Sequence, residues 1–204
     1  MGAGWTSTFL IPLLKKSGLT YAATTTTGRD GTYKFKFASS SPSSLSELDQ
    51  YSALPHAKTI LITFPLTGPG SSTRLVSSYT KTHEEEYQSS YQWIQLGSTG
   101  IWQISNQDLW VDRSSRYEET NARAVAEDEL LGLGGCVLDL AGLWGGARDP
   151  KHWIDRVAGT KEALSGKTSL HMVHGEDVAR GIVGVHGKFE EAKGERFVCS
   201  LSSS

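Results

Sequence analysis

Apolar residues recur along the chain with two periods, one typical of helices and the other of strands. Residues 1–18 carry apolar side chains at positions 9, 10, 13 and 14, the spacing of one helix face, and end in two lysines and a glycine, as helices often do. Residues 33–37 alternate between aromatic and lysine side chains, and the segment 19–25 before them is rich in strand formers. This stretch predicts a helix followed by two strands that are joined by a loop.

The two periods alternate further along the chain. We expect helices near residues 45–54, 71–90, 121–131 and 154–164, and strands at 59–64, 91–96 and 135–141. Strands that alternate with helices form a parallel sheet with helices on both faces, because right-handed crossovers place them there. The sequence therefore predicts one α/β domain with a Rossmann-like, doubly wound parallel sheet over residues 1–197, followed by a polar tail at 198–204.

A glycine-rich segment, GAGWTS, precedes the first predicted helix directly. In dinucleotide-binding folds the first glycine allows a tight turn, the second lets the backbone approach a pyrophosphate, and a small third residue permits close helix packing. The helix N-terminus then offers free N–H groups to the phosphates. The alternative is a merely flexible, glycine-rich N-terminus. The candidate cofactor-binding residues are Gly2, Ala3, Gly4, Trp5, Thr6 and Ser7.

The region about 20 residues beyond this loop bears on the choice between NAD and NADP. A site that prefers NAD usually has an acidic residue there, after the second strand. This chain has threonines at 24–27, and Arg29 and Asp30 follow. The missing carboxylate and the nearby cation favour NADP over NAD, with Arg29 as a further candidate cofactor-binding residue. Alternatively, Arg29 is a solvated turn residue.

Four segments together resemble the NAD-dependent epimerase/dehydratase family, a branch of the extended short-chain dehydrogenases/reductases. They are GAGW at 2–5, LGSTGIW at 96–102, VLDLAGLWGG at 137–146 and MVHGEDVA at 172–179. Their order and spacing agree with the family, which is more specific than any one of them. The resemblance implies a Rossmann fold, a nicotinamide cofactor and possible oxidoreductase or epimerase activity on a carbonyl or sugar substrate that the sequence does not identify.

The resemblance also implies roles for particular residues. Ser98 or Thr99 matches the family's hydroxyl that hydrogen-bonds a substrate carbonyl or alcohol, although these residues could simply cap a strand end. The family's catalytic tyrosine and lysine are replaced by Glu119 and Arg123, and arginine does not release a proton at neutral pH. Arg123 is therefore a candidate for binding a ribose or a phosphate, with a solvated surface arginine as the alternative. The usual acid–base pair is absent.

Charge and composition exclude several other classes of function. A net charge of −2, with dispersed lysines and arginines, does not favour nucleic acid as a partner. The apolar runs are too short to cross a membrane, so we expect a cytoplasmic protein without a membrane partner. The two cysteines have no metal-site spacing, and His171 and His174 lack an evident third ligand, so no metal is expected. The oligomeric state is open.

The strand that should precede a glycine-rich phosphate loop is reduced to Met1, and the chain ends soon after the fourth segment. The sequence therefore resembles an N- and C-terminally shortened member of the family. Three hypotheses follow. The first is an atypical NAD(P)-dependent oxidoreductase or epimerase, the second a non-catalytic NAD(P)-binding sensor or scaffold, and the third a truncated, inactive relative.

Overall fold

A computed structural model describes residues 1–38, 45–83, 91–102, 112–152, 158–165 and 171–200. Its helices are α1 Ser7–Lys16, α2 Leu45–Ser52, α3 Ser71–Thr82, α4 Ala122–Gly132, α6 Lys161–Ser165, α7 Gly175–Gly187 and α8 Phe189–Ala192, with short 3₁₀ turns η1 Thr99–Trp102 and η2 Pro150–His152. Its strands are β1 Thr24–Thr25, β2 Tyr33–Lys34, β3 Thr59–Ile62, β4 Gln92–Ser98, β5 Cys136–Leu140, β6 Gly142–Trp144, β7 Met172–His174 and β8 Arg196–Cys199.

The central sheet has four parallel strands in the order β3-β4-β5-β8. Strand β4 is buried along almost its whole length, as expected of a parallel strand that is covered on both faces. Strands β1 and β2 form a separate parallel pair, and β6 pairs with β7 beyond the end of β5. The predicted α/β class and parallel sheet are confirmed.

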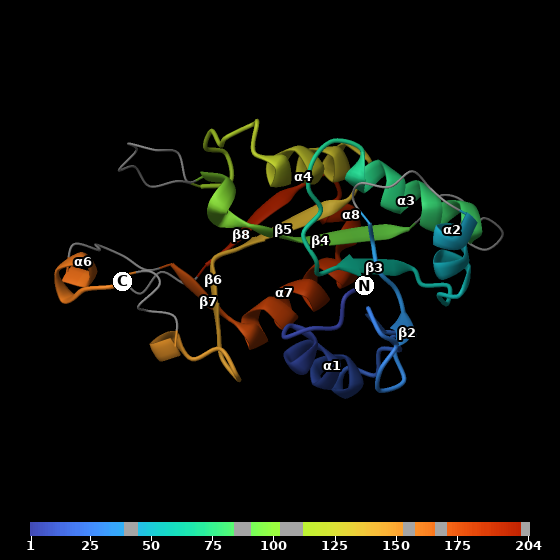
Figure 1. Cartoon of the computed structure of the whole chain (residues 1–204), viewed down its shortest axis with the longest axis horizontal. Helices are drawn as coiled ribbons and strands as arrows, with labels where there is room; N and C mark the ends of the chain where they lie inside the picture. The colour runs from blue at the N-terminus through green and yellow to red at the C-terminus, as the bar shows by residue number, and fades with distance from the viewer. Residues whose placement is uncertain (39–44, 84–90, 103–111, 153–157, 166–170, 201–204) are drawn as a thin grey trace.

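Residues 1–3 lie between the two-stranded sheet and β3. The Met1 carbonyl accepts a hydrogen bond from the Thr63 N–H at 3.1 Å, and the Met1 amine donates to the Leu61 carbonyl. On the other side, the Ala3 N–H donates to the Thr24 carbonyl at 2.6 Å. With residues 1–3 in the place of a first strand, the spatial order matches the 3-2-1-4-5-6 arrangement of the dinucleotide-binding fold. In Figure 1 the N-terminus lies beside β3.

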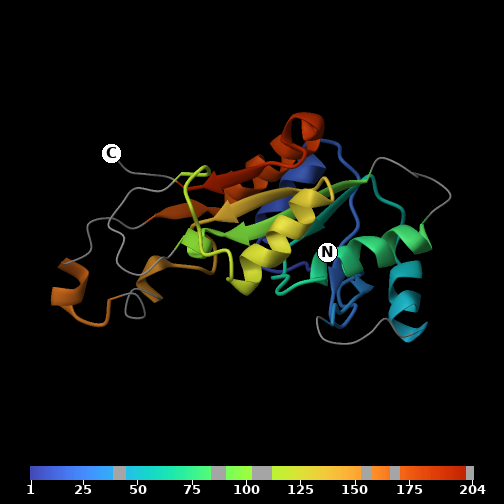
Figure 2. The ribbon, with the colours of Figure 1, turned by 90° about the horizontal axis from the view of Figure 1, so that it is seen from above.

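Helices cover both faces of the sheet (Figures 1 and 2). One face carries α1, α7 and α8, whose apolar side chains pack on Ile94, Leu96, Leu138 and Leu140. The other carries α2, α3 and α4, which pack on Ile60, Ile62, Trp93 and Val137. Alternate residues of β4 and β5 thus enter different cores, which is the period of two that a strand requires. The doubly wound arrangement is confirmed.

Several predicted boundaries differ from the structure. A single helix over 154–164 is wrong in its described part, because residues 158–160 are not helical and α6 begins only at Lys161. Gly159 has low helix propensity, and the Thr160 hydroxyl accepts the Ala163 N–H at 3.1 Å, which caps the start of α6. The predicted strands 19–25 and 33–37 contain only two strand residues each.

Strand β8 extends to Cys199, two residues into the predicted polar tail, because Val198 and Cys199 pair with Asp139 and Leu140 of β5. Helix α3 ends at Thr82, and residues 84–90 of the helix expected there lie outside the described part of the chain. None of the described helices is long and apolar enough to cross a bilayer.

Candidate functional site

The site begins at the turn that leads from residues 1–3 into α1. Gly2 has a φ of +89°, a conformation that favours glycine, and a Cβ there would lie 2.6 Å from the Thr63 hydroxyl oxygen. A Cβ added to Gly4 would meet only the Gly2 carbonyl oxygen, at 4.0 Å. The tight turn therefore needs Gly2, whereas Gly4 leaves open space in front of the backbone.

The start of α1 offers free backbone donors. In the described residues, the N–H groups of Gly4, Trp5 and Thr6 donate to no acceptor, while the Ser7 N–H bonds the Gly4 carbonyl at 3.0 Å. The Ser7 hydroxyl also donates to that carbonyl, at 2.5 Å, so the Ser7 side chain stabilises this turn. Free N–H groups and the positive end of a helix dipole attract anions such as phosphates.

Two cavities meet at this turn, and both are lined by Gly2 and Gly4. The first, called the Ser98 cavity, has a volume of about 360 Å³. It is bounded by Trp5 and Thr6, by Thr63 and Phe64 after β3, by the ends of β4 and β5, and by Arg123 and Arg148. The second, called the Arg29 cavity, has about 370 Å³ and is lined by Ala3, residues 25–27 and Arg29.

In the described part of the chain, the lining of both cavities contains arginines and no carboxylate. Arg123 and Arg148 face the Ser98 cavity, and Arg29 borders the other. The Arg29 side chain is 70 % exposed and lies 3.8 Å from the Asp30 carboxylate, a separation at which water screens the pair strongly. Each cavity therefore has positive charge in its lining.

The structure separates the two predicted hydroxyl groups. Ser98, at the end of β4, lines the Ser98 cavity, and its oxygen accepts the Gly100 N–H at 3.2 Å. Because that oxygen is the acceptor, the Ser98 O–H remains available to a ligand. Thr99 does not line the cavity, and its hydroxyl lies 3.4 Å from the Leu140 carbonyl, to which it donates. Ser98 is thus the better placed of the two.

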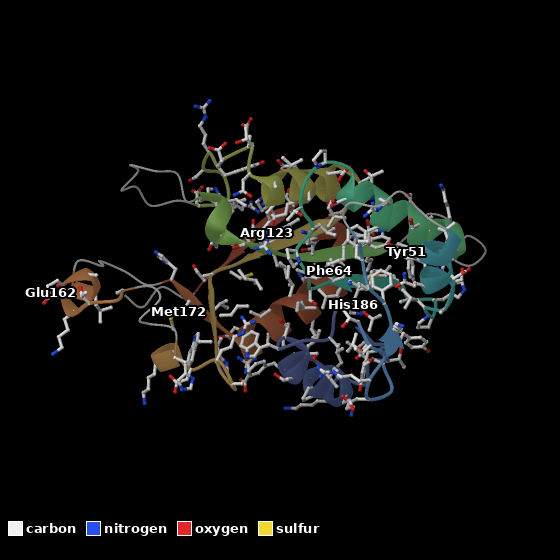
Figure 3. All side chains as sticks on the ribbon, in the orientation of Figure 1. Tyr51, Phe64, Arg123, Glu162, Met172 and His186 are labelled. Carbon is white, nitrogen blue, oxygen red and sulfur yellow. The ribbon has the colours of Figure 1, made fainter. Side chains whose placement is uncertain are left out.

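Arg123 lies in the first turn of α4 and points into the Ser98 cavity. Its N–H donates at 2.9 Å to the side chain of Asn121, which caps the helix. Within the described residues the half-buried guanidinium has no carboxylate within ion-pair distance. Figure 3 labels Arg123 and Phe64, which lie close together in that view and line the same cavity.

Glu119 and Tyr117, the two ionisable side chains near the expected tyrosine position, do not line the Ser98 cavity. Glu119 is exposed in the loop before α4. The Tyr117 hydroxyl donates to Asp128 at 2.7 Å, and burial together with that hydrogen bond raises the pKa of Tyr117 to about 12. Tyr117 therefore holds its proton at neutral pH and is directed away from the cavity.

Sequence reasoning missed Arg148, which lies two residues beyond the third family-like segment. Its guanidinium carbon lies 4.6 Å above the centre of the Trp5 ring, and the Trp5 indole N–H donates to the Gly145 carbonyl at 3.0 Å. Gly145 and Arg148 exchange two backbone hydrogen bonds of 3.0 Å. These contacts hold the guanidinium at the mouth of the cavity. In the sequence, the one signal for Arg148 is its position two residues after Gly146.

A buried charge cluster, also missed, lies behind the end of β4. Arg196 donates to Glu127 at 2.6 Å, to Asp139 at 2.7 Å and to Asp128 at 2.8 Å. Burial, together with the nearby Asp139 charge, raises the pKa of Glu127 to about 7 against the opposing effect of Arg196. Burial also raises the pKa of Asp139. The pair therefore holds a proton to a higher pH than exposed carboxyl groups do. The cluster joins α4, which carries Arg123, to β5 and β8.

The fourth family-like segment has a structural role in this chain. The His174 ring accepts the Glu176 N–H at 3.3 Å and caps α7, and Arg180 pairs with Asp177 at 2.8 Å and Glu176 at 3.1 Å. Negative side chains in a first helical turn are favourable there. In the described part of the chain, no group of three potential ligands is placed to hold a metal ion.

Solved structures share this fold over the whole chain. A human epimerase family protein, SDR39U1 isoform 2 with NADPH, matches with a TM-score of 0.65 and 15 % identity over 100 % of this chain and 73 % of its own. The chain has the fold of the epimerase-type short-chain dehydrogenases/reductases.

Two further structures agree with this fold. A short-chain dehydrogenase/reductase superfamily protein from Agrobacterium tumefaciens with bound NAD has a TM-score of 0.64 and 12 % identity over 98 % of this chain and 75 % of its own. Vestitone reductase from alfalfa has a TM-score of 0.60 and 18 % identity over 98 % and 75 %. No protein-family model and no curated protein matches the sequence.

Proposed function

We propose that this chain binds a nicotinamide dinucleotide, NADP in preference to NAD, across the two cavities. The observation that carries the proposal is that both cavities meet at Gly2 and Gly4, directly before the free N–H groups of α1. A dinucleotide has its pyrophosphate in the middle and one nucleoside at each end. The open space at Gly4 fits the pyrophosphate, and the two cavities fit the two ends.

The chain's own residues distinguish the ends. The Arg29 cavity suits the adenosine end, because Arg29 would offer a cation to a 2′-phosphate on the adenosine ribose. The Ser98 cavity has Phe64, Ser98 and Arg123 around it and suits the nicotinamide end and a substrate. The neighbours that contain NADPH or NAD support a nicotinamide cofactor for this fold.

In this proposal the chemistry is that of an atypical oxidoreductase or epimerase. A bound nicotinamide supplies a carbon that gives or takes a hydride. The Ser98 oxygen accepts the Gly100 N–H, and its own O–H is free to donate a hydrogen bond to the substrate oxygen. Arg123 stays charged and stabilises negative charge on that oxygen, but it does not supply the proton. The proton comes from water in a reduction and goes to water in an oxidation.

A substitution at Gly4 tests cofactor binding without a large effect on folding. Gly4→Val adds methyl groups where the protein leaves open space, so the variant should fold and lose NADPH binding by about tenfold or more. Isothermal titration calorimetry with NADPH gives the affinity, and thermal melting reports folding. Gly181→Ala, on α7 with nothing near its added Cβ, is the control and should bind as the wild type does. Unchanged NADPH affinity in Gly4→Val would exclude this site.

A second substitution tests the preference for NADP. Arg29→Gln should weaken NADPH binding about tenfold and leave NADH binding unchanged, because only NADPH carries the 2′-phosphate. Arg180→Gln removes an arginine of similar exposure from α7 and serves as the control. Equal loss of both cofactors, or no loss of either, would contradict the role of Arg29.

A non-catalytic NAD(P)-binding sensor or scaffold is the second candidate function. It is favoured by the absence of Tyr117 and Glu119 from the lining of the Ser98 cavity. NADPH oxidation, followed at 340 nm with a panel of aldehydes, ketones and 2-oxo acids, detects an oxidoreductase. Interconversion of nucleotide sugars, followed by chromatography, detects an epimerase, because an epimerase consumes no net cofactor. Binding without turnover on the whole panel supports the sensor, and turnover that is lost in Ser98→Ala supports the enzyme.

A further inference from the structure

The Ser98 cavity contains two guanidinium groups in addition to the backbone N–H groups proposed to bind the pyrophosphate. Arg123 enters it from α4 and Arg148 from the turn after β6, so two separate elements contribute the charges. Among the residues that the structure describes, none that lines the cavity carries a carboxylate to neutralise them. The free N–H groups for a pyrophosphate lie at Gly4, Trp5 and Thr6, at the start of α1.

The position of Arg148 is fixed before any ligand binds. Its guanidinium stacks on Trp5, and the indole of Trp5 is held by the Gly145 carbonyl. Gly145 and Gly146 have φ values of +107° and +55°, and a Cβ on Gly146 would lie 3.2 Å from the Phe9 ring. The turn therefore needs both glycines in order to bring Arg148 back over Trp5. A side chain that is ordered in advance loses less entropy when it binds an anion.

We propose that the Ser98 cavity selects a small substrate with a carboxylate next to its reacting carbonyl or alcohol carbon, and that Arg123 and Arg148 bind the carboxylate. This inference rests on the proposed function, since the reacting carbon lies beside Ser98. The planar fork of an arginine matches both oxygens of a carboxylate. A cavity of about 360 Å³ is near the lower end for ligand sites and also receives the nicotinamide end, so the substrate is small.

Oxamate, in which a carboxylate adjoins an amide carbonyl, is a suitable inert probe, and its neutral ester ethyl oxamate is the matched comparison. Calorimetry on the NADPH-saturated protein should show oxamate binding at least tenfold more tightly than the ester. Equal binding of the two, or no binding of oxamate, would overturn the proposal. Inorganic phosphate is titrated in parallel, and tighter binding of phosphate than of oxamate would also overturn it, because the site would then select phosphates.

Variants assign the binding to the two arginines. Arg148→Gln and Arg123→Gln should each weaken oxamate binding about tenfold or more, and Arg148→Gln should change NADPH affinity less than threefold. Arg148→Lys keeps the charge without the planar fork, so its oxamate affinity should lie between those of the wild type and Arg148→Gln. Arg180→Gln should have no effect. If Arg148→Gln weakens NADPH and leaves oxamate unchanged, the arginine serves the cofactor and the proposal is wrong. Because Arg148 is exposed at the cavity mouth, its variants are not expected to unfold the chain.

A titration of oxamate without cofactor separates this inference from the proposed function. If NADPH fails to bind the wild-type chain, the proposed function is wrong. Oxamate binding that persists and is lost in Arg148→Gln would then still establish the carboxylate site. If NADPH binds and oxamate does not, the proposed function stands and the carboxylate site is excluded.

Discussion

At Gly97 the backbone of β4 passes directly over two buried carboxyl groups. A Cβ there would overlap the Asp139 Oδ1 atom and lie 2.7 Å from Glu127 Oε1. Both oxygens belong to the cluster that Arg196 holds together. The absence of one side chain therefore lets a charge cluster lie against the strand that ends in Ser98.

We predict that Gly97→Ala destabilises the chain by about 1–3 kcal/mol, because the added methyl group overpacks a buried polar cluster. Urea unfolding followed by circular dichroism gives the free energy of unfolding. Gly181→Ala, whose Cβ meets no atom within 4 Å, should leave stability equal or slightly higher. Equal stability of Gly97→Ala and wild type would show that the carboxyl groups move aside freely.

The same cluster predicts a pH dependence of stability. The pKa of Glu127 is raised to about 7, mainly by burial, so the folded state holds a proton that the unfolded chain releases near its ordinary value of 4.5. The stabilisation is therefore present below about pH 4.5 and is lost as the pH rises through 7, by up to about 3 kcal/mol.

The measurement is the free energy of unfolding between pH 5 and pH 8 for wild type and Glu127→Gln. The neutral amide cannot release a proton, so the variant should lose most of this decline. An equally steep decline in Glu127→Gln would assign the pH dependence to other groups.

Among the elements, α1 and α7 pack together on one face of the sheet, and their contact depends on Gly175. A Cβ on Gly175 would overlap the Phe9 ring, which also meets Trp5 at a centroid distance of 5.0 Å and His174 at 5.4 Å. The packing of α1 on α7 thus also determines where Trp5 stands at the cavity.

We predict that Gly175→Ala displaces Phe9, destabilises the chain by about 1–3 kcal/mol and weakens NADPH binding. Gly184→Ala, in the same helix with nothing near its Cβ, is the control for the added methyl group. The two variants are compared by urea unfolding and by calorimetry. Unchanged stability in Gly175→Ala would mean that α1 can shift without loss.

The elements that the sequence predicts well are those with a strong apolar period. Helices α1 and α4 and strands β4 and β5 follow from such patterns because their apolar residues form the two cores. The charge cluster does not follow, since Arg196 meets Glu127 and Asp139 across 69 and 57 residues of sequence. Ser98 and Arg123 are candidates through a family resemblance, whereas Arg148 becomes a candidate only in the fold, because the turn at Gly145 brings it to Trp5.

Over the whole molecule, the candidate site gathers segments from most of the chain. The Ser98 cavity takes residues from the start of α1, the ends of β3, β4 and β5, and α4. The segment with η2 and α6 extends away from the sheet in Figures 1 and 2, and α6 buries none of its residues. A ligand in the cavity should therefore stabilise the sheet and its covering helices as one unit. It should stabilise α6 less, because α6 does not line the cavity.

We predict one cooperative thermal transition that moves upward with NADPH. At a cofactor concentration of 100 times Kd the stabilisation is about 2.7 kcal/mol, which for a chain of this size is a rise in Tm of roughly 5–10 °C. Differential scanning calorimetry with and without NADPH measures it. A transition that does not move with NADPH would contradict binding to the folded state.

Trp5 gives the chain an optical property that follows from its place between the two proposed ligands. Its indole borders the Ser98 cavity and lies under the Arg148 guanidinium. The emission of an indole depends on neighbouring charges and is absorbed by a reduced nicotinamide nearby. Trp5, one of six tryptophans in the chain, should therefore report cofactor binding through energy transfer and carboxylate binding through a change in its own emission. Its share of the signal is the part that Trp5→Phe removes, so two events in one cavity can be followed without an added label.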